Sequence, residues 1–517
     1  MLKWRTWLLT VVLLPLSVSA SDYFEQLGWV KEQSELTNLI HYQDELEQVY
    51  QKNGNQLIWF DLHQGSSLEF RLEVIQRAGF SPLFERQLSY LQYFRKSNRW
   101  HEYDLLATDT LLLYLNYAEK AKSEGKDWFF GTQLDKPIRP ILESSLMTLE
   151  RAIENQQLAE VIDAYTPDSP DYKQLIESYL ALINFQKVDL PFYQQTGLKR
   201  EGDLLEDRDT LLARLELVDV DLSDVPRDLM EYDAALESAV KRFQRLHGLK
   251  PDGVIGPKTI KWINMSIDSR LSQLALNAER TRYWPKARDT IIVVNVPSYD
   301  MKYWSNGEQV FESKVVVGKK ARPTPVMVTN LNALILNPTW NVPWKIMVED
   351  IIPKVKRDPM YLYRQNIEIL PKWGSSERID PTEINWASVN PKAFPYRMTQ
   401  RSGYHNALGL YKFNTPNSRA IYLHDTPSKG LFQSDQRAFS SGCIRVEHAD
   451  VFADRLLKSQ GISQTKVAEF NQQSNKAIPL RKGIPVHIIY QTAWYEEGKT
   501  HYREDIYHLD SFSASKG

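Results

Sequence analysis

The chain contains a single cysteine, Cys443, among its 517 residues. An intrachain disulfide or a cysteine-based metal cluster is therefore excluded, and the fold must be held together by apolar packing. With 42% hydrophobic residues, 25% charged residues and 14 tryptophans, the composition is that of a soluble globular protein and excludes wholesale disorder. At ~150 residues per domain, the length predicts roughly three domains.

Charge and histidine content argue against two further classes of function. The 63 basic and 65 acidic residues leave a formal net charge of −2, so bulk charge does not hold this protein to nucleic acid. The 10 histidines are dispersed and no His-Glu-x-x-His string is present, which together with one cysteine disfavours a zinc site. We therefore expect neither a metal ion nor a cofactor.

Residues 1–20 have the three-part layout of a secretory signal peptide. Lys3 and Arg5 precede an apolar run from Trp7 to Leu16, and small residues follow at 17–20. The run is shorter than the ~20 apolar residues that a membrane span needs. We therefore expect a protein exported across the cytoplasmic membrane. The alternatives are an uncleaved anchor, which would be the sole membrane contact, and a buried first helix.

Helical periodicity dominates the first half of the chain. Leu142, Leu146, Leu149 and Ile153 recur at helical intervals. Residues 21–199 carry no chemical motif, and this combination predicts a helical scaffold domain. Residues 266–289 predict a linker helix.

Residues 200–265 predict a compact helical module. A helix expected over Ala234–His247 carries one apolar stripe, and Gly248 can end it in the left-handed conformation. Asp252-Gly253 favours a tight turn, and Pro257 can open the next helix.

From residue 290 the apolar pattern changes to that of strands. Thr290–Val296 is rich in β-branched residues, and Asn306-Gly307 is typical of a two-residue hairpin turn. Ile484–Tyr490 predicts a late strand, and Asp505–Tyr507 predicts a final strand or tail. Residues 290–510 are therefore expected to form one mainly-β domain.

An unusual concentration of prolines interrupts this β-rich region. Residues 338–400 hold eight of the chain's 26 prolines, which disfavours regular sheet. We expect an irregular insertion with short helices, placed between strands of one domain. Insertions of this size are often lids over a site, and the alternative is a plain surface excursion.

The cysteine lies in a polar, glycine-containing segment, Ser440-Ser441-Gly442-Cys443. A helical apolar pattern follows it, so Cys443 is expected just ahead of a helix N-terminus, whose dipole favours thiolate over thiol. Arg445 would add a cation nearby. A thiolate is the reactive form of cysteine, and these features predict a nucleophile. The alternative is an inert structural thiol.

His424 is the candidate base for this nucleophile. It ends a predicted strand, and the turn signals after it allow the chain to return toward Cys443. Tyr422 lies two residues earlier and so points to the same face. Its hydroxyl and the backbone N–H groups of Gly442 and Cys443 could stabilise an oxyanion. A strand-end histidine without a chemical role is the alternative.

Two parts of the chain resemble known families. The string from Phe243 to Thr259 resembles the small three-helix peptidoglycan-binding module of cell-wall enzymes. Residues 290–510 resemble the YkuD-type catalytic domain of the L,D-transpeptidases. The matching positions are His424, Ser440, Gly442, Cys443 and Arg445. Many members have histidine at the position of Ser441 and asparagine at that of Arg445.

The resemblance implies a multidomain α+β protein. It would comprise a helical scaffold, a peptidoglycan-binding-like module and a mainly-β catalytic domain with an inserted capping subdomain. The implied reaction cleaves the diaminopimelate–D-Ala bond of a tetrapeptide stem through a Cys443 thioester. Transfer to an amine of a second stem would form a 3→3 cross-link. Ser440, Ser441 and Arg445 would shape the pocket.

The resemblance also implies ligands, partner proteins and a cellular compartment. Stem peptides and glycan would be the ligands, and carbapenems would acylate the cysteine. Carboxypeptidases that make tetrapeptides and synthases that make glycan strands would be partner proteins, and the periplasm would be the compartment. Nucleic acid is not expected to bind.

Three alternatives differ in chemistry. Water as acceptor would make an L,D-carboxypeptidase or an amidase of the same fold. An NlpC/P60-type or papain-like peptidase places its cysteine before its histidine, the reverse of His424 and Cys443. A non-catalytic wall-binding scaffold would keep its function without the thiol.

Overall fold

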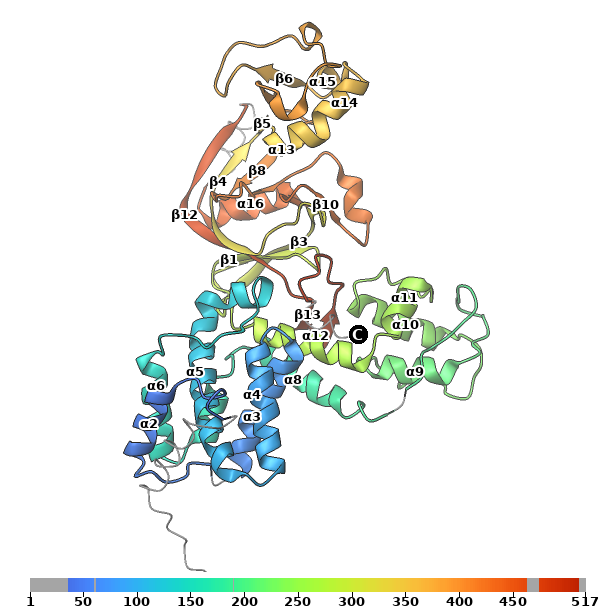
Figure 1. Ribbon diagram of the computed structural model, residues 1–517. Coiled ribbons are helices and arrows are strands. Elements are labelled where there is room, and N and C mark those ends of the chain that lie inside the picture. Colours follow the sequence, from blue (N-terminus) through green and yellow to red (C-terminus); the bar gives the residue numbers. More distant parts are fainter. Residues whose placement is uncertain (1–35, 60–61, 189, 463–473, 511–517) are drawn as a thin grey trace, which may run out of the picture. The chain divides into compact units, whose positions relative to one another are not determined.

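The computed structural model describes residues 36–59, 62–188, 190–462 and 474–510. The chain forms two compact units, which divide between Pro167 and Asp168 (Figure 1). The predicted leader at residues 1–20 lies outside the described residues. In the described ranges, none of the helices combines the length and the apolar character that a membrane crossing requires.

The first unit is helical, as the scaffold prediction expects. Its long helix α5 packs against α2, α3, α4 and α6. Asp109 of α5 is buried and accepts the backbone N–H groups of His41 and Tyr42, at 3.0 and 2.9 Å. The carboxylate thus fixes the chain ahead of α2. The helices are α2 (Gln43–Lys52), α3 (Leu62–Ala78), α4 (Pro82–Lys96), α5 (Trp100–Phe130), α6 (Glu143–Glu154) and α7 (Leu158–Ala164).

The second unit begins with five helices. The first of them, α8, packs against α12 and so belongs to this unit. The predicted scaffold domain, which extends to residue 199, includes α8. The apolar side chains of α8, among them Leu175 and Tyr179, are buried here. The helices are α8 (Pro170–Ile183), α9 (Arg208–Glu216), α10 (Ala234–Leu246), α11 (Pro257–Ile263) and α12 (Ile267–Arg280).

The signals at the ends of α10 and α11 act as predicted. Gly248 follows α10 with φ of +64°, and Gly253 in the turn has φ of +75°. Both angles favour glycine because a Cβ atom is strained in this region. Pro257 occupies the first turn of α11.

A nine-stranded sheet forms the centre of the second unit. Its order is β10-β3-β11-β9-β8-β4-β12-β1-β2, and β2 also pairs with β3, so the sheet closes on itself. The predicted hairpin joins β2 and β3, with positive φ at both Asn306 and Gly307. The strands are β1 (Ile291–Asn295), β2 (Asp300–Ser305), β3 (Glu308–Gly318), β4 (Met327–Leu336), β8 (Tyr411–Asn414), β9 (Leu423–His424), β10 (Ala438–Ser440), β11 (Ile444–Val446) and β12 (Lys476–Ile489).

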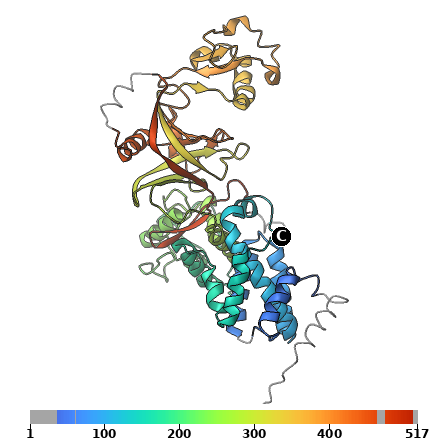
Figure 2. The same ribbon diagram turned by 90° about the vertical axis from the view of Figure 1, so that its left-hand side faces the viewer.

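The proline-rich segment has a small sheet and a core of its own. The expected short helices form, but the expectation that prolines disfavour regular sheet is not met, because each strand is short and the prolines lie outside the strands or at helix starts. Buried apolar residues such as Met347, Ile352 and Met398 form the core. The segment lies beyond one end of β4 and β12 (Figure 2). We call residues 338–400 the insert.

The elements of the insert form a sheet of order β5-β7-β6 with short helices beside it. They are β5 (Trp340–Asn341), α13 (Trp344–Ile346), η1 (Met347–Ile351), α14 (Ile352–Arg357), α15 (Tyr361–Arg364), β6 (Ile367–Leu370), η2 (Pro381–Glu383), η3 (Pro391–Ala393) and β7 (Arg397–Gln400). Outside the insert, η4 (Lys429–Gln433) and α16 (Ala449–Ser459) connect strands of the large sheet.

The C-terminal part differs from its prediction. Asp505–Tyr507 forms turns rather than a strand. A hairpin of β13 (Ala493–Glu496) and β14 (Lys499–Tyr502) precedes it. Its turn at Glu497-Gly498 has two positive φ angles, although Glu497 is no typical turn residue.

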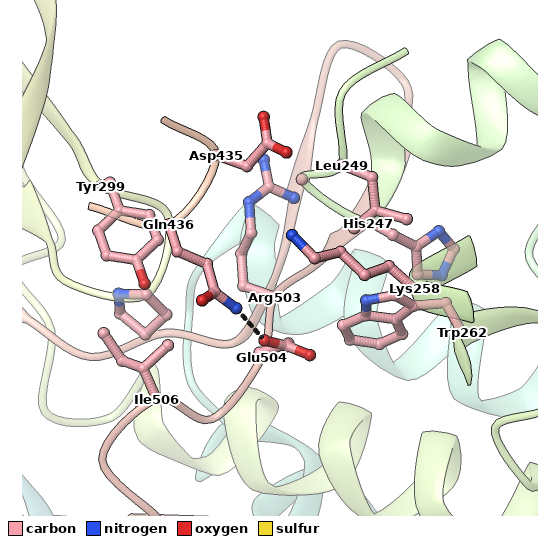
Figure 3. Close-up of a pocket in the computed structure, with 12 residues that line it drawn as sticks. His247, Leu249, Lys258, Trp262, Tyr299, Asp435, Gln436, Arg503, Glu504 and Ile506 are labelled. Carbon is pink, nitrogen blue, oxygen red and sulfur yellow. Dashed lines mark hydrogen bonds between the residues drawn. The ribbon is translucent and has the colours of Figure 1, made fainter. Parts of the chain in front are cut away.

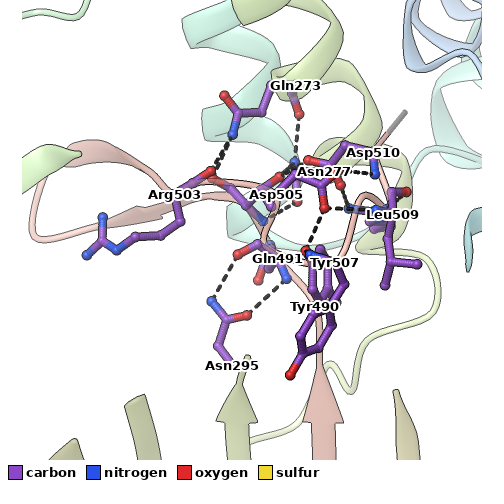
Figure 4. Close-up of polar contacts among 12 residues, drawn as sticks. Gln273, Asn277, Asn295, Tyr490, Gln491, Arg503, Asp505, Tyr507, Leu509 and Asp510 are labelled. Atoms are coloured by element: carbon purple, nitrogen blue, oxygen red, sulfur yellow. Dashed lines mark hydrogen bonds and ion pairs between the residues drawn. The ribbon is translucent and has the colours of Figure 1, made fainter. Parts of the chain in front are cut away.

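The segment after β12 ties α12 to the large sheet (Figure 4). Asn277 of α12 exchanges hydrogen bonds of 2.7 and 2.8 Å with Thr492. The fully buried Arg280 pairs with Asp510 at 2.6 Å and donates to the Leu509 carbonyl at 2.8 Å. The predicted linker helix is therefore packed and hydrogen-bonded along its length.

A crevice separates the helical module from the C-terminal segment (Figure 3). Glu504 accepts a hydrogen bond from Gln436 at 2.9 Å and pairs with Lys261 at 2.8 Å. Arg503 donates to the Leu246 carbonyl at 3.0 Å. The cavity measures about 40 Å³, room for a few water molecules and no larger ligand.

We expect Arg280→Met to destabilise the second unit by about 3 kcal/mol, because removing one partner leaves Asp510 with an uncompensated charge. Urea denaturation followed by tryptophan fluorescence measures the loss. Lys499→Met is the matched control, since its partner Asp219 is exposed, and it should change the free energy of unfolding by under about 1 kcal/mol. Equal effects of the two substitutions would contradict the prediction.

Candidate functional site

Three neighbouring strands of the large sheet carry the predicted site residues. β9 pairs with β11 so that Arg445 lies opposite His424, and with β8 so that Lys412 lies opposite His424. Residues in register on adjacent strands, and residues two apart on one strand, point to the same face. Lys412, Tyr422, His424, Cys443 and Arg445 therefore share one face, which we call the cysteine face.

Cys443 is partly buried, and its thiol donates to the Ala420 carbonyl at 3.6 Å. Ala420 has φ of +53°, a strained value for a residue with a side chain. Tyr422 joins the strand pair next to it, because the Ile444 N–H donates to the Tyr422 carbonyl at 3.0 Å. The thiol thus lies at the start of β11, beside Ala420 and Tyr422 in the segment that leads into β9.

The electrostatics of the thiol has opposing contributions. Burial raises the pKa of Cys443 above its ordinary value, while Tyr422 and the cations of Lys412 and Arg445 lower it in part. Lys412 Nζ lies 4.3 Å from the centroid of the Tyr422 ring, a cation–π geometry. Arg445 Nε has no hydrogen-bond partner among the described residues. Tyr422 and these two cations are the groups that favour a thiolate here.

His424 is 4% exposed and is held by its own backbone. Nδ1 bonds to the Asp425 carbonyl, which assigns the proton to Nδ1 and leaves the lone pair on Nε2. Burial, with a smaller effect of Arg445, lowers the pKa of His424 to about 3. The imidazole is therefore neutral at working pH. No hydrogen bond joins it to the thiol within the described ranges, so the thiol must turn from Ala420 to reach it.

One prediction about the nucleophile is wrong. Cys443 leads into strand β11, and helix α16 begins only at Ala449. Ile444 and Val446 are both fully buried and pair in the sheet, so the apolar pattern begins as a strand and becomes helical later. The helix dipole is therefore too far away to activate the thiol, since its effect is confined to the first turn.

Ser440 shapes the loop before the cysteine. Its hydroxyl donates to the Cys443 carbonyl at 2.6 Å and accepts the Gly442 N–H at 3.0 Å. The Gly442 amide, predicted as an oxyanion donor, is thus already used within the loop. Gly442 has φ of +116°, and a Cβ there would approach Ile421 to 3.2 Å. Thr324 donates to the Gly442 carbonyl at 2.8 Å.

Arg322, which the sequence did not single out, joins this loop to the insert. It is 9% exposed and donates to the Ser441 hydroxyl at 2.8 Å. The same guanidinium forms ion pairs with Glu349 and Asp350, both on η1 of the insert. Arg322 and Ser441 are 119 positions apart, so no local sequence pattern indicates this contact.

A cavity of about 710 Å³ lies between the insert and the cysteine face. Trp340 and Trp344 line it, whereas Tyr404 is 80% exposed and is not part of the lining. Cys443 and His424 are not among the lining residues, whereas Tyr422 and Ala420, whose carbonyl accepts from the Cys443 thiol, are. The lining residues are Ile335, Thr339, Trp340, Asn341, Val342, Pro343, Trp344, Met347, Trp373, Arg397, Leu408, Lys412, Ala420, Tyr422 and Asn475.

The arrangement is suited to nucleophilic chemistry. A thiol, an imidazole with a free lone pair, a phenol and two cations share the cysteine face, and Tyr422 and Lys412 of this face line a cavity large enough for a peptide segment. In the part of the chain that the structure describes, no group of three His, Cys, Asp or Glu side chains could hold a metal ion.

Comparison with family profiles divides the chain into three parts. Residues 289–488 match the YkuD profile, described as "L,D-transpeptidase catalytic domain". Residues 44–178 match a profile described as "Scaffold domain", and residues 207–263 match one described as "Putative peptidoglycan binding domain". The predicted fold class, a multidomain α+β protein with these three parts, is confirmed.

A curated relative from Haemophilus influenzae, named "Putative L,D-transpeptidase", is 33% identical over 409 residues. The aligned region covers 79% of this chain and 66% of the relative, so the chain spans just under two thirds of that protein's length.

Among solved structures, an L,D-transpeptidase from Mycobacterium smegmatis is 11% identical, with 39% of this chain and 58% of that chain covered and a TM-score of 0.19. An L,D-transpeptidase from Xylanimonas cellulosilytica is 13% identical, with 57% and 99% covered and a TM-score of 0.19. Scores this low carry no argument about the site.

We expect alkylation of Cys443 by iodoacetamide to accelerate with pH up to and beyond pH 9, the ordinary pKa of a thiol. Burial raises this pKa, so the thiolate fraction still increases there. A neutral His424 predicts no inflection near its ordinary pKa of 6.5. Mass spectrometry of the alkylated protein measures the rate, and a plateau beginning below pH 7 would contradict the prediction.

In the same assay, Lys412→Met should move the alkylation profile to higher pH, because it removes a cation that favours the thiolate. Lys458→Met on α16 is the control, since Lys458 is exposed and pairs with Asp454. It should leave the profile unchanged.

We expect Arg322→Met to release the insert from the cysteine loop. Hydrogen bonds to charged groups contribute about 1.5–3 kcal/mol, so hydrogen exchange in η1 and α14 should accelerate by about tenfold or more. Arg364→Met is the control because Arg364 pairs with Asp358 inside the same insert. Unchanged exchange in the Arg322 variant would show that other contacts hold the insert.

Proposed function

Because residues 289–488 match the profile of the L,D-transpeptidase catalytic domain and a relative named "Putative L,D-transpeptidase" is 33% identical, we propose that the chain is a cysteine acyltransferase acting on peptidoglycan stems. The donor is a tetrapeptide stem, and the bond cleaved joins diaminopimelate to the terminal D-alanine. The observation that carries this proposal is the cysteine face, where Cys443, His424 and Tyr422 lie together and from which Tyr422 lines a cavity of about 710 Å³.

In the first half-reaction, Cys443 attacks the diaminopimelate carbonyl carbon. The thiol proton moves to Nε2 of His424, and the new S–C bond gives a tetrahedral intermediate with a negative oxygen. When this collapses, the C–N bond breaks and the proton on His424 passes to the departing amine of D-alanine. The product is a thioester and free D-alanine, and His424 is neutral again.

In the second half-reaction, an amine of a second stem attacks the thioester carbonyl. His424 takes the amine proton and returns it to sulfur as the C–S bond breaks, which restores the thiol. The product is a 3→3 cross-link between two diaminopimelate residues. The low pKa keeps the imidazole unprotonated, so its Nε2 lone pair is available at the start of each step.

Negative charge develops on sulfur and on the substrate oxygen during the proposed reaction, which gives the cations of the cysteine face a role. The Tyr422 hydroxyl and the Cys443 N–H are the proposed oxyanion donors, since the Gly442 N–H is bonded to Ser440. Lys412 and Arg445 would stabilise the thiolate and the intermediate by charge, and both are partly buried, where such interactions are strong. Ser440 holds the loop and Ser441 anchors it to Arg322.

The insert is proposed to cap the cavity. Trp340, Trp344 and Trp373 form a wall over the cysteine face, which would exclude water and favour an amine as acceptor. The region matched as a peptidoglycan-binding domain supports attachment to the wall polymer. We further propose a periplasmic location, with tetrapeptide-forming carboxypeptidases and glycan synthases as partner proteins.

Incubation of the full chain with disaccharide-tetrapeptides, analysed by mass spectrometry, tests the reaction. We expect cross-linked dimers and released D-alanine, and neither with Cys443→Ala. Tyr422→Phe should lower kcat by about 10²–10³-fold with little change in KM, as expected for loss of an oxyanion donor. Tripeptides without dimers would instead identify water as the acceptor. Activity in Cys443→Ala would overturn the mechanism.

A further inference from the structure

The cavity over the cysteine face has an unbalanced charge. Arg397 and Lys412 line it, and none of its described lining residues is acidic. Arg397 belongs to β7 of the insert, whereas Lys412 belongs to β8 of the large sheet. A cavity with cations from both sides and no carboxylate of its own is complementary to an anionic ligand.

The two cations differ in what they already contact. Lys412 lies over the Tyr422 ring and influences the thiol, so its charge serves the reacting atoms. Arg397 makes a 3.4 Å hydrogen bond to the adjacent Tyr396 carbonyl, and no ion pair joins it to an acid within the described ranges. By contrast, Arg378 and Arg401, which lie outside the strands of the small sheet, both pair with Glu368 of β6.

The rest of the lining restricts the kind of anion. Trp344 and Trp373 are 52% and 45% exposed, which leaves large apolar surfaces beside the guanidinium without cover from the protein. A small inorganic anion would not cover them. A peptide with a free carboxylate would, since its chain can lie along the aromatic surfaces while its carboxylate reaches the guanidinium.

We propose that Arg397 is a specificity-determining residue that binds a free carboxylate of the acyl-donor peptide. This inference rests on the proposed function. Arginine suits the role because its planar guanidinium matches a carboxylate in a two-bond geometry. A donor held at Arg397 on the insert and attacked by Cys443 on the sheet spans both walls of the cavity.

The contact has a chemical consequence. Amidation of the bound carboxylate removes its charge and places an NH₂ donor against the guanidinium, which has donors only. Donors amidated at that position should therefore bind more weakly, while the carbonyl that Cys443 attacks is unchanged.

The test uses the full chain with tetrapeptide donors in which the free carboxylates are amidated one at a time. Release of the terminal residue gives kcat and KM for wild type, Arg397→Gln and Arg397→Lys. We expect wild type to prefer the free acid over the amide at one position by about tenfold or more in KM. Arg397→Gln should lose this preference, with kcat within about twofold, and Arg397→Lys should keep part of it.

Arg401→Gln is the matched control, because it removes a cation that directly follows the insert and does not line the cavity. It should keep the wild-type preference. Iodoacetamide labelling of Cys443 reports whether each variant retains a folded site. Equal preference in wild type and a folded Arg397→Gln would overturn the inference and leave the proposed function standing. A wild-type chain that turns over none of the donors would overturn both.

Discussion

The register among β8, β9 and β11 is the constraint on which the site depends. It sets Lys412, His424 and Arg445 in one row and brings Tyr422 and Cys443 to the same face. A slip of one residue in either pairing would turn the shifted strand's side chains to the other face. The fully buried Leu423, Ile444 and Val446 resist such a slip, because it would expose them. Packing on the far face therefore maintains the chemistry on the near face.

Within this register, burial and charge act in opposite directions on the thiol. Burial raises the pKa of Cys443 and lowers that of His424, so both groups are neutral at rest. A preformed thiolate–imidazolium pair would place a third positive charge beside Lys412 and Arg445. Proton transfer from sulfur to imidazole is more favourable during attack, when negative charge passes from sulfur to the substrate oxygen. The cations then stabilise the charge wherever it resides on the cysteine face.

Turn and helix-end residues predict much of the fold from the sequence. Contacts between residues far apart in the sequence cannot be predicted from such local patterns. The Asn306-Gly307 turn, the end of α10 at Gly248 and the start of α11 at Pro257 depend on neighbouring residues, and each prediction is confirmed. Strand and loop patterns around Cys443 and His424 make them the candidate site residues, although the apolar pattern after Cys443 predicts a helix where the structure has the short strand β11. Arg322 and Lys412 carry no local signal, since only the folded chain brings Arg322 to Ser441 and Lys412 to Tyr422.

Two arginines link the insert and the site: one extends from the site to the insert, and the other lies on the insert and faces the cavity. Arg322 extends from the large sheet to the carboxylates of η1, and Arg397 lies on the insert and lines the cavity above the sheet. The first contact joins the insert to Ser441, the residue before Gly442 and Cys443. A substrate carboxylate at Arg397 would add a second link between the same two bodies. Binding of the donor and ordering of the nucleophile loop would then be coupled, because each restricts the same motion of the insert.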